Sequence, residues 1–116
     1  MRPDLARWQW DGYPTYHQRP LTLWLHLFAV PAFVASTASL ALHLARLDLA
    51  GVGLALLGMV VAFGAQGFAH QREHNPAIAF AGPGDALSRV FLEQFFTFPR
   101  FVLSGRWWRA LRAPGA

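Results

Sequence analysis

The chain has 116 residues, a length that suits one domain; 54% of them are hydrophobic and only 14% are charged. A soluble domain this small exposes much of its surface and needs more charge, so the composition favours lipid as part of the solvent. There is no cysteine, which excludes disulfides and thiolate sites. The net charge of +4 comes from arginines interspersed with Trp and Phe, so we expect anionic lipid headgroups, and no nucleic acid, as the partner.

Residues 1–20 form a polar, aromatic lead that we place in the cytoplasm. Pro3 and Pro14 argue against a long helix in this segment, because proline cannot donate a backbone hydrogen bond. Pro20 is suited to the first position of the next helix, where a missing N–H costs nothing.

Two uncharged segments follow, residues 21–45 and 49–70. Each is long enough, at about 1.5 Å per residue, to cross a hydrocarbon core of about 30 Å. Pro31 is expected to kink the first of them. Glycines in the second segment are expected to allow close packing against the first: Gly51, Gly53, Gly58 and Gly64.

The short turn Arg46–Asp48 makes these segments an antiparallel hairpin. A soluble helical hairpin is the alternative, but neither segment shows the polar stripe that an amphipathic helix needs. Nine of the ten arginines flank the open end and only Arg46 lies in the turn. The positive-inside rule therefore places both termini in the cytoplasm. We expect an integral membrane protein, located in a bacterial inner membrane.

Residues 84–112 read as an amphipathic, interfacial segment. A helix is expected over Ala86–Phe98, with Asp85 as its N-cap and with an interruption at Pro99. Tryptophans flanked by arginines then suggest aromatic rings at headgroup depth and guanidinium groups on phosphates; a re-entrant or third span is the alternative. The predicted fold class is an all-α membrane protein, one domain over 1–116: a transmembrane helical hairpin plus C-terminal amphipathic interfacial helices.

Four of the five histidines converge on one membrane face. His70 and His74 share a helical face at a spacing of four residues, and the hairpin brings His17 and His26 to the same end. His43 is separated from His26 by 17 positions in the sequence, about 25 Å at helical rise, and cannot share their site.

Imidazoles with the nearby carboxylates Glu73 and Glu93, and no thiolate, predict a site for Fe(II), Mn or Zn. The alternative is that His17 and His74 are polar interfacial residues and that His26 and His70 hydrogen-bond between helices. Glu73 and Glu93 have their own alternative as ion-pair partners of Arg72 or Arg89.

The sequence resembles the Mpo-like family, small membrane proteins related to the fungal 2-hydroxy fatty acid dioxygenase of phytosphingosine metabolism. One block is Tyr16-His17, His26 and Pro31. A second is Gln66, His70, Glu73-His74-Asn75 and Pro76-Ala77, and the ending Leu103-Ser104-Gly105-Arg106 is also similar. The departures are Thr22 in place of Asn, Ala29 and Ala69 in place of glycines, and Glu73 three rather than four residues after His70.

The resemblance implies an enzyme with an Fe(II) cofactor that shortens a 2-hydroxy fatty acid by one carbon with O₂. It implies that His17, His26, His70 and either His74 or Glu73 hold the iron, the four histidines being the catalytic set. The lipid carboxylate would lie at headgroup depth, with Arg19 or Arg72 as its partner. Two other functions stay open: a haem-binding hairpin with His26 and His70 as axial ligands, and a non-enzymatic membrane scaffold.

Overall fold

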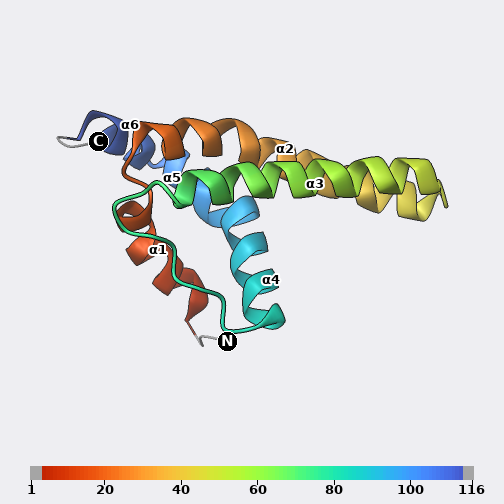
Figure 1. The fold of residues 1–116 in the computed structure, drawn as a ribbon, viewed down its shortest axis with the longest axis horizontal. Helices are drawn as coiled ribbons and strands as arrows, with labels where there is room; N and C mark the ends of the chain where they lie inside the picture. The colour runs from red at the N-terminus through yellow and green to blue at the C-terminus, as the bar shows by residue number, and fades with distance from the viewer. Residues whose placement is uncertain (1–3, 114–116) are drawn as a thin grey trace.

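The computed structural model describes residues 4–113, and within them all regular structure is helical, which confirms the all-α class. Two long helices form a hairpin, and shorter helices precede and follow it (Figure 1). The elements in chain order are α1 (Leu5–Tyr16), α2 (Pro20–Ala45), α3 (Leu49–His70), α4 (Pro83–Leu92), the π-helix η1 (Glu93–Thr97), α5 (Phe98–Leu103) and α6 (Arg106–Arg112).

Helices α2 and α3 are long and apolar enough to cross a membrane, and they lie side by side along their length (Figure 1). Pro20 occupies the first turn of α2, as expected, and Pro31 lies inside a helix that continues on both sides. At the turn, the Asp48 carboxylate accepts a hydrogen bond from the Gly51 N–H at 3.2 Å, which satisfies a free donor at the start of α3.

Only some of the α3 glycines lie against α2. A Cβ at Gly51 would collide with the His43 ring, and a Cβ at Gly58 would collide with the Ser36 hydroxyl, so these two positions require glycine for close approach. Gly53 and Gly64 have no atom near their Cβ positions. The prediction that they serve helix packing is therefore wrong, because they point away from α2.

The lead contains a helix that the prolines did not predict. Helix α1 runs from Leu5 to Tyr16 and includes Pro14 in its last turn. Pro14 cannot donate a backbone hydrogen bond to the carbonyl of Trp10, and burial of Tyr13 against the C-terminal helices compensates for this loss. Pro3 lies outside the described residues.

The C-terminal segment breaks at a different place from the one expected. Pro99 is the second residue of α5, which directly follows the π-helix η1, so the helical path continues through it. The break comes instead at Gly105, whose φ of 84° is left-handed and favours glycine. Asp85 is not the N-cap either: it lies in the first turn of α4, where its carboxylate accepts from the Ala81 N–H at 2.9 Å. That bond holds the pKa of Asp85 below its ordinary value.

The short helices assemble at the open end of the hairpin, and the turn end projects beyond them (Figure 1). The Trp107 indole N–H donates to the Leu23 carbonyl at 2.9 Å, which holds α6 on the first turns of α2. The buried amides of Gln66 and Gln94 donate to each other at 2.9 and 2.8 Å, which fixes η1 against α3. Six buried apolar residues form the core at this end: Tyr13, Leu23, Val30, Phe98, Phe101 and Trp107.

Candidate metal centre

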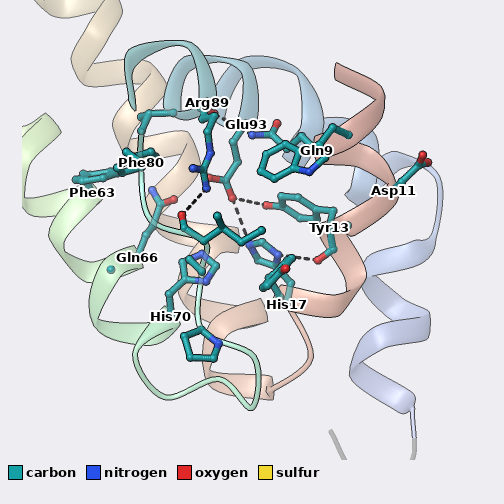
Figure 2. Close-up of a pocket in the computed structure, with 18 of the residues that line it drawn as sticks. Gln9, Asp11, Tyr13, His17, Phe63, Gln66, His70, Phe80, Arg89 and Glu93 are labelled. Atoms are coloured by element: carbon teal, nitrogen blue, oxygen red, sulfur yellow. Dashed lines mark hydrogen bonds and ion pairs between the residues drawn. The ribbon is translucent and has the colours of Figure 1, made fainter. Parts of the chain in front are cut away.

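Three histidines and one glutamate converge where these helices meet. His17 follows α1, His26 lies in the second turn of α2, His70 ends α3, and Glu93 begins η1. One ligand atom from each of the four lies within 4.8 Å of every other, a spacing at which they could hold a metal ion. Figure 2 shows His17, His70 and Glu93 directed toward one another, with Tyr13 beside them.

The three imidazole rings pack around one point. Their centroids are 4.8 Å (His17–His26), 4.6 Å (His17–His70) and 4.9 Å (His26–His70) apart, and the ring planes are nearly perpendicular in each pair. Such an arrangement presents three nitrogens to a common centre from different directions, as a metal with open positions requires.

Hydrogen bonds on the far side of two rings orient them toward the centre. Nδ1 of His17 lies 2.8 Å from the Tyr13 carbonyl, and Nδ1 of His26 lies 2.9 Å from the Thr22 carbonyl. A carbonyl only accepts, so Nδ1 donates in both residues, and in the neutral ring Nε2 then carries a lone pair. This is the outer-shell bond that metal-binding histidines ordinarily make.

Hydrogen-bond acceptors, the imidazole Nε2 atoms and a carboxylate oxygen, therefore face one another inside the cluster. Nε2 of His17 and of His26 lie 3.3 and 3.5 Å from Glu93 Oε2, and neither nitrogen has a hydrogen-bond partner among the described residues. Nδ1 of His70 is also buried without one. A cation is needed to balance these atoms: either a proton or a metal ion.

The carboxylate of this buried cluster keeps its negative charge. Burial would raise the pKa of Glu93, but pairing with His17 and His26 outweighs burial and holds that pKa well below its ordinary value. Burial lowers the pKa of His17, although Glu93 opposes this shift. The site thus keeps a carboxylate charge while His17 holds an extra proton weakly, and neutral imidazole is the form that binds metal.

Tyr13 supports two members of the cluster. Its hydroxyl donates to Glu93 Oε2 at 2.7 Å, its carbonyl accepts from His17, and its ring stacks on the His17 ring with centroids 3.7 Å apart. Burial, followed by the charge of Glu93, raises the pKa of Tyr13 well above its ordinary value, so the hydroxyl keeps its proton and remains a donor.

A cavity of about 690 Å³ opens beside the cluster. His17, His70 and Glu93 form part of its wall, and apolar side chains such as Phe63, Ile78 and Phe80 form another part. A metal held by the cluster would therefore face an apolar space with room for a ligand or substrate.

The structure does not bring His74 and Glu73 to this cluster. Helix α3 ends at His70, so His74 no longer shares the His70 face; its Nδ1 lies 3.4 Å from an Arg19 guanidinium nitrogen. The Glu73 carboxylate accepts from the backbone N–H groups of Gln18 and Arg19 at 3.0 and 2.9 Å. It anchors the turn after α3 to the segment that carries His17, which is a supporting position.

Glu93 takes the place that the sequence analysis gave to His74 or Glu73. The signal for it was weak: Glu93 is the only acid in the apolar stretch between Arg89 and Arg100. His43 lies apart from the cluster, as expected, and pairs with Asp48 at 3.1 Å near the hairpin turn.

Comparison with protein-family models, with curated proteins and with solved structures found no match for this chain. The case for its function consequently depends on its own residues and their geometry.

Proposed function

We propose that this chain is an integral membrane protein that binds Fe(II) through His17, His26, His70 and Glu93 and oxidises 2-hydroxy fatty acids. The observation that carries the proposal is the convergence of three imidazoles and one carboxylate on the wall of a largely apolar cavity. One buried nitrogen of each of these histidines has no hydrogen-bond partner among the described residues. The donor set of nitrogen and oxygen atoms suits Fe(II), and the open side faces the cavity.

The exposure of the hairpin supports a membrane location. Only 22% and 17% of the most apolar windows of α2 and α3 are buried within the chain, whereas the core helix of a soluble protein is mostly buried. Large side chains such as Phe28, Leu54 and Val60 are 69%, 71% and 68% exposed. Apolar surface of this extent requires lipid or a partner to cover it.

The cavity supports an amphipathic substrate. When bound, Fe(II) would supply the electrons that activate O₂ and the positions at which a 2-hydroxy carboxylate chelates. Among the protein's own residues, Tyr13 holds one oxygen of Glu93, and the apolar part of the cavity wall would receive the start of the acyl chain. The C1–C2 bond breaks, and the acid plus O₂ gives the shortened acid, CO₂ and water, which balances without another reductant.

The two arginines expected from the sequence to pair with the substrate carboxylate lie outside the cavity. Arg72 stacks on Phe68, with its guanidinium 3.7 Å from the ring centroid, and Arg19 approaches His74; neither lines the cavity. Arg89 does line it, but its guanidinium already donates to the carbonyls of Ile78 and Ala79. Arg7 also lines the cavity, so in this proposal the substrate carboxylate is recognised by chelation to the metal and by the Arg7 guanidinium.

A non-haem ion is favoured over haem by the crowding between the two candidate axial ligands. The rings of His26 and His70 are 4.9 Å apart, and Nε2 of His26 already lies 3.5 Å from the Glu93 carboxylate. A macrocycle between the two rings would have to displace Glu93.

The test is metal analysis of the detergent-purified chain, paired with product analysis on a 2-hydroxy fatty acid under O₂. We expect about one ion per chain, no strong haem absorption band, and formation of the acid shortened by one carbon. His70→Ala and Glu93→Gln should lose the ion and the activity, because each removes a ligand.

His43→Ala and His74→Ala are matched controls that remove an imidazole from outside the cluster. Both should keep the ion. Retention of metal in His70→Ala together with its loss in His43→Ala would overturn the proposed site. Metal binding without conversion of any 2-hydroxy fatty acid would overturn the reaction alone.

A further inference from the structure

The positive charge of the chain is concentrated in its last 23 residues. Residues 1–93 contain six arginines and six acidic residues, which cancel; residues 94–116 contain four arginines and no acidic residue. The whole net charge of +4 therefore belongs to the segment that begins in η1. Such a surface attracts anions.

Two of these arginines meet on one aromatic ring. The guanidinium carbons of Arg100 and Arg106 lie 4.0 and 4.5 Å from the centroid of the Trp10 ring. Neither side chain has an ion pair with any carboxylate among residues 4–113. Trp10 packs in turn against the buried core at the open end of the hairpin, so the two like charges are held together by a fixed platform.

This pair of cations lies where the headgroups of a membrane would be. Arg106 begins α6, and the next residue, Trp107, donates to the Leu23 carbonyl near the start of α2. Exposed apolar and aromatic side chains surround the pair in sequence: Phe95, Phe96, Leu103 and Trp108. A hollow of about 420 Å³ beside Arg106, also lined by Pro14, Phe101 and Arg109, gives room for a polar group.

We propose that Arg100 and Arg106, held against Trp10, bind the phosphate of an anionic phospholipid headgroup. Planar guanidinium groups suit bidentate contacts with phosphate oxygens, and stacking on the indole fixes their orientation before the ligand arrives. The proposal depends on the membrane location proposed above and is independent of the oxidation reaction.

Lipid binding at this site would also steady the metal centre, because residues of α1 support both sites. Trp10 and Tyr13 belong to α1, and Tyr13 contacts both His17 and Glu93. A headgroup that fixes Trp10 therefore fixes the helix from which the cluster is supported.

The experiment is native mass spectrometry of the full chain, released from mixed bilayers of phosphatidylglycerol and phosphatidylcholine. We expect the wild type to retain phosphatidylglycerol in preference to phosphatidylcholine. In the double variant Arg100→Gln/Arg106→Gln this preference should fall on the order of tenfold, since two cation–phosphate contacts are lost. Equal retention of the two lipids by the wild type would overturn the proposal.

The matched control is Arg72→Gln/Arg112→Gln, which removes the same charge from two guanidiniums that each stack on a different ring, Phe68 and Trp108. It should keep most of the preference. An equal loss of the phosphatidylglycerol preference in both double variants would overturn the specific site, because diffuse surface charge would then explain the binding. Displacement of the lipid by inorganic phosphate alone would overturn the lipid as the occupant.

Arg100→Lys/Arg106→Lys keeps the charge and preserves folding if the Gln variant does not fold. It should show a preference between those of the wild type and the Arg100→Gln/Arg106→Gln variant, because ammonium groups lose the planar stacking. A lysine variant equal to the wild type would overturn the role assigned to Trp10. Metal content measured on the same samples separates this test from that of the proposed reaction.

Discussion

At the scale of single residues, Tyr13 supports the cluster without being one of its four members. It fixes Glu93 with its hydroxyl and His17 with its carbonyl and ring, so one residue of α1 orients two members of the cluster from different elements. Only the first of these contacts requires the hydroxyl. A substitution that keeps the ring therefore tests the Glu93 contact by itself.

Tyr13→Phe should weaken metal affinity by about 10- to 100-fold, the usual effect of losing an outer-shell hydrogen bond. Competition with a chelator of known affinity measures this, and thermal unfolding of the metal-free protein checks that the fold persists. Tyr16→Phe is the matched control, since Tyr16 lines the same cavity and its hydroxyl makes no hydrogen bond among the described residues. Equal affinity of Tyr13→Phe and the wild type would contradict the role given to Tyr13.

At the scale of elements, the approach of α2 to α3 sets the distance between His26 and His70. That approach depends on small residues: Gly58 faces Ser36, and Gly51 faces His43. In the proposed membrane location, lipid offers apolar contact equal to that of another helix, so close backbone packing would hold the hairpin together. Glycines that face away from α2 do not contribute to it.

Gly58→Ala should destabilise the hairpin by about 1–3 kcal/mol, the usual cost of inserting a methylene into a packed interface. Gly53→Ala, which meets no atom within 4 Å, should be neutral or slightly stabilising. Thermal or denaturant unfolding in detergent measures the difference. Ser36→Ala added to Gly58→Ala removes the nearest obstructing atom and should recover part of the loss; without any recovery, the contact with Ser36 is not the cause.

At the scale of the whole molecule, the hairpin and the short helices divide the protein into two ends. The cluster, the cavity and the arginine-rich helices share the open end, and the turn with Arg46 and Asp48 lies at the other. The positive-inside rule applied to this distribution gives the proposed topology, with the metal centre at the cytoplasmic face.

A topology of this kind predicts opposite labelling of two introduced cysteines. The native chain has no cysteine, so Arg46→Cys and Arg112→Cys each give a single thiol. In intact cells a membrane-impermeant reagent should label the first from outside, and the second only after the membrane is permeabilised. Labelling of both positions from the same side would refute the transmembrane hairpin.

The sequence by itself determined the two long helices and the meeting of three histidines. An uncharged run of sufficient length specifies a long apolar helix, and a short turn between two such runs places His17, His26 and His70 at the same end. These features depend on local composition and on chain direction, which a sequence displays directly.

Only the tertiary structure decided the fourth member of the cluster, the helical lead and the position of the C-terminal break. Glu93 reaches the cluster because Gln94 pairs with Gln66 and because Tyr13 packs from α1, contacts between residues far apart in the chain. His74 is excluded because α3 stops at His70, where Glu73 bonds instead to the backbone before α2. Helix ends and contacts between residues far apart in the sequence are decided by packing energies that no local pattern encodes. For this reason the spacing of residues alone pointed to His74.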